Sequence, residues 1–347
     1  MDKIPAKKIC VIRTSALGDV VHAMALVEAL RHGYPDAEIT WVLQPLAYEM
    51  VKHQGAADHY VLFDRKGGRK HWQELRKRFK GEVYDVVLML QVSIKASAIS
   101  TLIKGRLKLG FDMARSRECQ WLFSNRRIPK KTPGHVQDQF FEFAEYLGVT
   151  DYPVAWNFGF TDAEQDKRSA FFDGLGAPAV TFVVASSSPD KDWPADRYAE
   201  AVDHVARKGL VPVLTGGPSP REKALADEIS RLAETKPVIA LQNGIRGLLV
   251  VLSGSTVVVS PDTGPLHMAV ALNVPTVSLF GYSNPRRCGP YRRFQELLID
   301  RFTESAEENG ARRYFKTGRM EYISVSDVTE KIDLALERYA GSATDRP

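Results

Sequence analysis

The segment SPDTGPLHMAVALNVPTVSLFG, residues 260–281, contains the signals of a strand end, a sharp turn, a short helix and a second strand. Asp262, Thr263 and Gly264 fall where the first strand ends, and His267 falls on the first turn of the helix. A strand–helix–strand unit is typical of a parallel sheet covered by helices. The acid, hydroxyl, glycine and imidazole gathered at its turn indicate a binding site.

The same alternation of strand-like and helix-like stretches extends outward from this segment. It runs from residue 7 to 91 and again from 180 to 281, with polar, proline-containing sequence at 151–166 between the two runs. A last helix begins near Ser324, which we expect to be its N-cap. We predict an α/β protein with two Rossmann-like halves, residues 1–160 and 161–322, followed by a segment at 323–347 whose helix packs back on the first half and whose tail is frayed.

The composition narrows the classes of protein. The 347 residues, 44% hydrophobic and 26% charged, are typical of a globular chain, and a net charge of +5 is too small for a dedicated nucleic-acid binder. Three widely spaced cysteines without a Cys-x-x-Cys pair indicate neither disulfides nor a zinc site. No apolar stretch is long enough to cross a bilayer. We expect a cytoplasmic protein whose membrane association, if any, is peripheral.

The segment TSALGDVVH, residues 14–22, lies between the first strand and the first helix. Gly18 suits a tight turn, and Asp19 then faces the crevice at the carboxyl ends of the strands, where ligands gather in parallel sheets. The alternative is that Asp19 is a helix N-cap or an ordinary first-turn acid. A single glycine is not the Gly-x-Gly-x-x-Gly fingerprint, so a dinucleotide-dependent dehydrogenase is disfavoured.

The second half repeats this pattern in VVASSSPDKDWP, residues 183–194. Ser186 and Ser187 end a strand, and Lys191 follows in the loop. Hydroxyls and an ammonium at such a place suit a phosphate, although a solvated serine-rich loop gives the same pattern. The N–H groups of Thr263 and Gly264 at a helix N-terminus favour a pyrophosphate in the same half.

Two further residues complete the candidate phosphate site. His267 can add a hydrogen-bond donor, although a histidine at such a position is often only packed in the core. Glu222, in TGGPSPRE at 215–222, can accept hydrogen bonds from a ribose, or it can be a first-turn helix acid.

A dense basic run, DRKGGRKHWQELRKRFKG at 64–81, marks the first half. It includes Arg69 and Lys70, with Trp72 and Phe79 interleaved. Such a run is usually a solvated face, but it also suits anionic lipid head groups or nucleic acid. Lys95, Arg115 and Arg117 add positive charge at later strand exits. The charge distribution suggests a nucleotide in one half and a polyanionic acceptor in the other.

Three of these motifs, TSALGD, SSSPDKDWP and DTGPLH, carry a resemblance over nearly the whole chain. In this order they resemble the lipopolysaccharide heptosyltransferases of glycosyltransferase family 9, and most the heptosyltransferase I type. The resemblance implies a GT-B fold, with two facing Rossmann-like domains and a cleft between them. It also implies transfer of a heptose from ADP-heptose to the Kdo–lipid A inner core, with inversion and without a metal or other cofactor, at the anionic cytoplasmic face of the inner membrane and without nucleic acid.

The resemblance also assigns roles to residues. The catalytic acid falls on Asp19, which would take a proton from an acceptor hydroxyl. The donor site falls on Ser186, Ser187, Lys191, Glu222, Asp262, Thr263, Gly264 and His267. Arg117 corresponds to an arginine directed at the acceptor, and the charge of the first half adds Arg69, Lys70 and Lys95. The serines stand where threonines are common in the family, and the basic run varies within it, which leaves the acceptor open.

Other functions fit parts of the pattern. A GT-B transferase could use another acceptor, such as an outer-core or capsule sugar or a protein, and a sugar-nucleotide epimerase shares the fold class. A non-catalytic anion-binding scaffold belongs to a different class. Asp19 discriminates among these, because a pure binding module does not need an isolated acid in the crevice.

Overall fold

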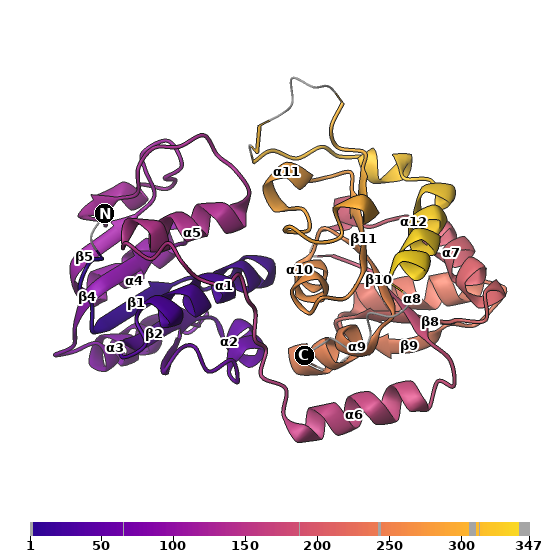
Figure 1. The fold of residues 1–347 in the computed structure, drawn as a ribbon, viewed down its shortest axis with the longest axis horizontal. Helices are drawn as coiled ribbons and strands as arrows, with labels where there is room; N and C mark the ends of the chain where they lie inside the picture. Colours follow the sequence, from indigo (N-terminus) through magenta and orange to yellow (C-terminus); the bar gives the residue numbers. More distant parts are fainter. Residues whose placement is uncertain are drawn as a thin grey trace. The chain divides into compact units, whose positions relative to one another are not determined.

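The computed structural model describes residues 3–64, 66–186, 188–241, 244–304, 310–311 and 313–339. The chain divides into two units, Met1–Gly159 and Phe160–Pro347, and each contains a six-stranded parallel sheet. Figure 1 shows helices on both faces of each sheet. The predicted α/β class is therefore confirmed. The expected frayed tail at 341–347 lies outside the described residues.

The first unit has the strand order β3-β2-β1-β4-β5-β6. Its strands are β1 (Lys8–Ile12), β2 (Glu38–Leu43), β3 (His59–Leu62), β4 (Val83–Met89), β5 (Lys104–Gly110) and β6 (Arg126–Arg127). Its helices are α1 (Leu17–Gly33), α2 (Pro45–Val51), α3 (Gly68–Arg78), α4 (Ile94–Leu102) and α5 (Val136–Tyr146). The direction of winding reverses between β1 and β4, which pair in register with Ile9 opposite Val86.

The second unit repeats this topology with the order β12-β11-β10-β7-β8-β9. Its strands are β7 (Ala179–Val183), β8 (Val211–Gly216), β9 (Val238–Leu241), β10 (Val257–Pro261), β11 (Thr276–Phe280) and β12 (Leu298–Asp300). Its helices are α6 (Asp162–Asp173), α7 (Ala195–Arg207), α8 (Pro220–Leu232), α9 (Ile245–Gly254), α10 (Gly264–Ala271), α11 (Pro285–Cys288) and α12 (Val325–Arg338). Here the reversal lies between β7 and β10.

The central strands are buried along their whole length, which explains their composition. The sequences AVTFV of β7 and VVVSP of β10 have no exposed residue. Strands covered by helices on both faces require such continuous apolar runs rather than alternating ones. In sheets of this topology, ligands bind at the carboxyl ends of the two strands that flank the reversal. The loops after β1 and β4, and those after β7 and β10, are therefore the places to look for a site.

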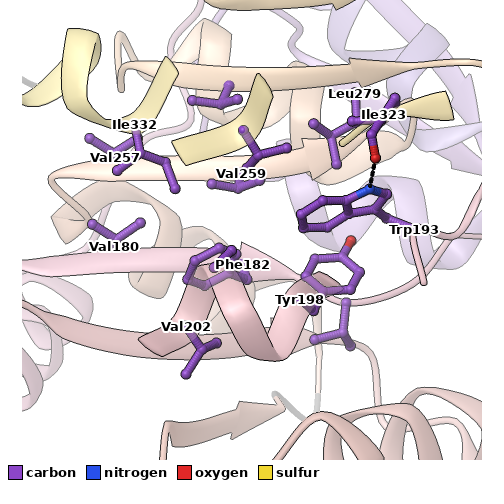
Figure 2. Packing of buried hydrophobic residues seen from close by; sticks show 14 of the residues in the cluster. Val180, Phe182, Trp193, Tyr198, Val202, Val257, Val259, Leu279, Ile323 and Ile332 are labelled. Carbon is purple, nitrogen blue, oxygen red and sulfur yellow. Dashed lines mark hydrogen bonds between the residues drawn. The ribbon is translucent and has the colours of Figure 1, made fainter. Parts of the chain in front are cut away.

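The last described helix corrects one expectation. Val328, Ile332 and Ala335 of α12 are buried in the core of the second unit, where the helix packs against α7, β10 and β11. Figure 2 shows Ile332 in this core, together with the Trp193 indole N–H that donates to the carbonyl oxygen of Ile323 at 2.9 Å. The prediction that this helix packs back on the first half is wrong, because its apolar stripe completes the second core. Its predicted N-cap, Ser324, is confirmed by a capping box.

Candidate functional site

Two predicted donor residues meet at the reversal point of the second sheet. Lys191 comes from the loop after β7, and Asp262 follows β10 directly. The Lys191 Nζ donates to Asp262 Oδ2 at 2.9 Å and to the Asp262 carbonyl oxygen at 3.0 Å. Both side chains are largely buried. The structure thus brings together two residues that are 71 positions apart in the sequence.

Asp262 is the centre of a larger cluster. Its Oδ2 accepts a hydrogen bond from the Ser283 hydroxyl, and its Oδ1 lies 3.5 Å from His267 Nε2. Burial alone would raise the pKa of Asp262, but the hydrogen bond from His267 and the charge of Lys191 hold that pKa well below its usual range. An ionised carboxylate repels a diphosphate. Asp262 is therefore suited to orienting Lys191 and His267 rather than to contacting an anion itself.

The turn after Asp262 forms the start of α10. Thr263 is the N-cap residue with extended backbone (φ −151°, ψ 170°), and the helix begins at Gly264. The Leu266 N–H already donates to the Thr263 carbonyl oxygen at 3.1 Å, whereas Pro265 has no N–H. The N–H groups of Thr263 and Gly264 precede this bond, at the positive end of the helix dipole. Together with Lys191, they form an environment suited to a phosphate.

The serine loop after β7 is held by its own hydrogen bonds. The Ser186 N–H donates to Asp192 Oδ1 at 2.8 Å, and its hydroxyl donates to the Ser188 carbonyl oxygen at 2.7 Å. Arg221 bonds both Asp192 and the Ser186 carbonyl oxygen. Ser186 therefore shapes the loop that carries Lys191. Ser187 lies outside the described residues.

Asp192 also bears on metal binding, because Asp190 and Asp192 flank Lys191 as an Asp-x-Asp sequence. Burial raises the pKa of Asp192, against the opposing effects of the Ser186 N–H and the Arg221 charge. Its carboxylate is engaged by these two partners. Across the described residues, no group of three or more His, Cys, Asp and Glu side chains is placed to hold a metal ion.

Glu222 takes the alternative that the sequence left open. It stands at the third position of α8, where Ser219 and Glu222 form a reciprocal capping box. The Gly217 N–H also donates to Glu222 Oε1 at 2.7 Å. The structure thus makes Glu222 a first-turn helix acid. Since a carboxylate has about four acceptor positions, Glu222 can still accept a hydrogen bond from a ribose hydroxyl.

An aromatic pair beside Lys191 was not predicted from the sequence. The rings of Tyr282 and Phe315 stack with centroids 5.0 Å apart and planes 19° apart. The Lys191 Nζ lies 5.7 Å from the centroid of Tyr282. Tyr282 follows β11 in GYSNP, a strand exit that the sequence could have marked, whereas its partner comes from a distant loop.

In the first unit, Asp19 lies in the first turn of α1. The N-cap residue is Ala16, so Asp19 is not the cap, and Gly18 lies inside the helix rather than in the turn before it. The Asp19 Oδ2 forms an ion pair with Arg13, which also donates from Nη1 to the Leu90 carbonyl oxygen at 2.8 Å. Arg13 therefore ties Asp19 to the ends of β1 and β4. Arg13 was not predicted from the sequence, although a basic residue at a strand end was a usable signal.

Two predicted acceptor residues, Lys95 and Arg117, lie in segments that are bonded to each other. Lys95, at the start of α4, lines a hollow of about 420 Å³ together with Gln44, Pro45, Asp64 and Lys66. The N–H of its neighbour Ile94 donates to Glu118 Oε2 at 2.7 Å. This bond holds the loop that carries the exposed Arg117 against the start of α4.

Arg115, two residues before Arg117, has a different environment. Its guanidinium is buried and forms ion pairs with Asp112 and Glu142. It is therefore part of the core and is not available to an acceptor.

The basic run forms α3 and its flanks. Arg69 and Lys70 are exposed, as expected, but Phe79 is buried and Trp72 packs against the core of the first unit. These two rings anchor the helix to the sheet, so it is the charged side chains of the run that remain placed to meet lipid head groups or nucleic acid. Among the described helices, none is long and apolar enough to span a membrane.

Comparison with known proteins gives a consistent result. The model of glycosyltransferase family 9 (heptosyltransferase) matches residues 69–314. The lipopolysaccharide core heptosyltransferase OpsX of Haemophilus influenzae is 32% identical over 311 residues, covering 89% of this chain and 88% of that protein. Lipopolysaccharide heptosyltransferase 1 of Escherichia coli K12 is 27% identical over 308 residues, covering 83% of this chain and 92% of that protein.

Solved structures agree in fold. The family 9 glycosyl transferase of Veillonella parvula superposes with a TM-score of 0.83 at 23% identity, covering 95% of this chain and 97% of that one. The structure of E. coli heptosyltransferase WaaC with ADP gives a TM-score of 0.73 at 23% identity, covering 94% of this chain and 99% of that one. The fold predicted from the sequence is that of these proteins.

Proposed function

The chain belongs to glycosyltransferase family 9, and from this we propose that it transfers a heptose from ADP-L-glycero-D-manno-heptose to the Kdo–lipid A inner core of lipopolysaccharide. Membership makes it a glycosyltransferase of the heptosyltransferase type. The choice of donor and acceptor, the inversion and the independence from metal are parts of the proposal. They are supported by the chemistry of the residues described above.

The observation that carries the donor assignment is the pairing of Lys191 with Asp262. It places an ammonium beside His267 and beside the N-terminus of α10, at the reversal point where nucleotides bind in this topology. As the glycosidic bond breaks, negative charge develops on the leaving diphosphate. Fixed cations and helix N–H groups can stabilise that charge without a metal ion, because they are already oriented.

Asp19 is assigned as the general base. In a single displacement, its carboxylate takes the proton of an acceptor hydroxyl while that oxygen attacks the anomeric carbon. The bond from this carbon to the diphosphate oxygen breaks, and its electron pair leaves with ADP. Attack opposite the leaving group inverts the configuration. Arg13 acts as a positioning residue, since it fixes the direction of the Asp19 carboxylate.

The first unit offers cations to an anionic acceptor. The bond from the Ile94 N–H to Glu118 joins the segments that carry Lys95 and Arg117, and Lys66 lines the same hollow as Lys95. An inner core rich in carboxylates and phosphates suits such a surface. The exposed basic residues of α3, including Arg69 and Lys70, would draw the protein to the anionic cytoplasmic face of the inner membrane at roughly 1 kcal/mol each.

A panel of ADP-, UDP- and GDP-sugars tests the donor assignment by thermal stabilisation. With all sugar nucleotides at one common concentration, we expect ADP-heptose to stabilise the protein most. At a concentration one hundred times its Kd, the stabilisation should be about 2.7 kcal/mol. Incubation with Kdo–lipid A should then add one heptose by mass spectrometry, with inverted anomeric configuration by NMR. Stabilisation by UDP- or GDP-sugars alone, or no transfer from ADP-heptose, would contradict the proposal.

A further inference from the structure

A group of exposed apolar side chains stands out on the first unit. Ile94 is 48% exposed, Met113 55%, Trp121 36% and Leu122 62%. Three of them come from one loop, residues 112–123 between β5 and β6, and Ile94 begins α4, to which that loop is bonded. We call these four residues the apolar patch. Large apolar side chains gathered in this way mark an interaction surface more often than those scattered singly.

The loop is a built structure. Gln120 is fully buried, and its Nε2 donates to the carbonyl oxygens of Met89 at 2.7 Å and Gln91 at 3.1 Å, at the end of β4. The Trp121 N–H donates to Ser116 Oγ at 3.2 Å. Hydrogen bonds to the sheet thus fix the loop from within while its apolar side chains face solvent.

The backbone of this loop is strained at its centre. Glu118 and Cys119 have φ values of 47° and 59°, in the left-handed region that non-glycine residues rarely adopt. Such conformations persist only where surrounding contacts impose them, and they concentrate at functional sites. Here those contacts include the bond from the Ile94 N–H to Glu118 Oε2. The strained pair is followed by Gln120 and then by Trp121 and Leu122.

The charges around the patch indicate what it meets. Arg117 lies inside the loop, and the exposed Arg126, Arg127 and Lys130 follow it. Glu118, the one acidic residue between 113 and 131, is bonded to α4. Tryptophan and aliphatic side chains surrounded by arginine and lysine are the composition of surfaces that enter the interface of an anionic bilayer. A neutral partner would not require such an excess of cations.

We propose that the apolar patch inserts into the interfacial layer of an anionic membrane and holds the first unit there. This rests on the proposed function only in the choice of a lipid-anchored acceptor. It also assigns different tasks to two surfaces of one unit. Leu75 of α3 is buried and Trp72 packs against the core, so α3 can attract the protein by charge but offers little apolar surface for insertion. Arg117 is in the same loop as three residues of the patch, and Lys95 follows Ile94 in the chain, so insertion would bring the acceptor residues to the membrane surface.

Vesicles that contain neither donor nor acceptor test the proposal. Flotation with phosphatidylglycerol-rich vesicles should show a partition coefficient at least about tenfold lower for the Trp121→Ala/Leu122→Ala double variant than for the unsubstituted protein. The matched control is Leu232→Ala/Ile239→Ala, which truncates two exposed apolar side chains of the second unit and should bind normally. Unchanged partition of the Trp121→Ala/Leu122→Ala variant would overturn the proposal.

Tryptophan fluorescence provides a second measurement that does not depend on the truncations. Adding the vesicles should shift the emission of the unsubstituted protein to shorter wavelength, and brominated lipids should quench it. In Trp121→Phe, both effects should be lost while vesicle binding persists. A full shift in Trp121→Phe would overturn the proposal. So would self-association of the unsubstituted protein, measured without vesicles, that the double variant abolishes. Insertion without any heptose transfer would leave this proposal standing and overturn the proposed function.

Discussion

Arg13 and Asp19 form an ion pair that joins the end of β1 to the first turn of α1. The pair engages one carboxylate oxygen, Oδ2, and the arginine is held in turn by the Leu90 carbonyl oxygen. The carboxylate is thereby fixed in direction at the reversal point of the first sheet. A side chain fixed in this way is suited to accepting a proton from a bound hydroxyl, and less suited to capping a helix.

Asp19→Asn removes the base but keeps the shape of the side chain. We expect kcat to fall by about 10²- to 10⁴-fold, the range typical of a lost general base, while the Kd for ADP-heptose stays the same. Turnover and donor affinity, measured side by side, check this. Asp138→Asn, in the first turn of α5, is the matched control and should keep full turnover. Unchanged kcat in Asp19→Asn would leave Asp19 as a structural residue.

Lys191→Met removes the ammonium that we assign to the diphosphate. Charge-assisted hydrogen bonds contribute about 1.5–3 kcal/mol, so the Kd for ADP should rise about 10- to 100-fold by calorimetry. The change also leaves the buried Asp262 carboxylate without its cation, which should lower Tm. Adding Asp262→Asn should restore Tm but not affinity. Recovery of ADP binding in the double variant would show that Lys191 acts only on the fold.

Metal removal should have no effect on transfer. Lys191, His267 and the N-terminus of α10 are expected to balance the charge of the leaving ADP in place of an ion. Initial rates in excess EDTA, and again after adding Mg²⁺, should therefore equal the untreated rate. A rate that collapses with EDTA and returns with Mg²⁺ would replace this scheme with a metal-dependent one.

Neutralising α3 separates attraction to the membrane from acceptor binding. Changing Arg69, Lys70, Arg76 and Lys77 to Gln should weaken binding to anionic liposomes and raise KM for a membrane-embedded acceptor, since each basic residue contributes roughly 1 kcal/mol near such a surface. KM for a deacylated, soluble acceptor should change less. By contrast, Arg117→Ala should raise KM for both acceptors. If the quadruple change affects neither liposome binding nor KM, α3 is only a solvated face.

Glu28 of α1 provides a pH-dependent test of stability. Burial raises its pKa from an ordinary 4.5 to about 6, against the opposing charge of Arg31. The folded state therefore binds the proton of the Glu28 carboxyl more tightly than the unfolded state does. The contribution of Glu28 to the free energy of unfolding then falls as the pH rises from 4.5 to 6. Glu28→Gln should remove a cost of about 1 kcal/mol above pH 6, after allowance for partial exposure. In thermal melts at pH 8, Glu28→Gln should have a higher Tm than the unsubstituted protein, and at pH 4 the two proteins should have the same Tm. An equal gain in Tm at both pH values would contradict this account of Glu28.

The elements around the site could be predicted because local signals specify them. Gly264 and Pro265 mark the turn between β10 and α10, and the apolar run before Asp262 is long enough for one buried strand. The direction of the Asp262 side chain could not be predicted. It depends on Lys191 and Ser283, which reach it only through the pairing of β10 with β7 and β11.

Side-chain roles were harder to predict wherever a local hydrogen bond competes with a ligand. Glu222 and Ser186 have the right residue types for a nucleotide site, yet both are bonded to backbone groups within a few residues. A sequence does not reveal which of the two uses is realised. The predicted position of α12 was wrong for a different reason. The sequence shows that this helix has an apolar stripe, but not which of the two sheets the stripe packs against.

The position of α12 affects how the protein folds during synthesis. The first unit has its complete sheet and covering helices once α5 and the segment up to Gly159 have left the ribosome. The core of the second unit remains open until α12 emerges, about 180 residues later, because Ile332 and its neighbours cover β10 and β11. At roughly 5–20 residues per second, the first unit can fold alone for about 10–35 s. During that interval the nascent second unit exposes apolar sheet surface, which leaves it open to aggregation for longer than the first unit.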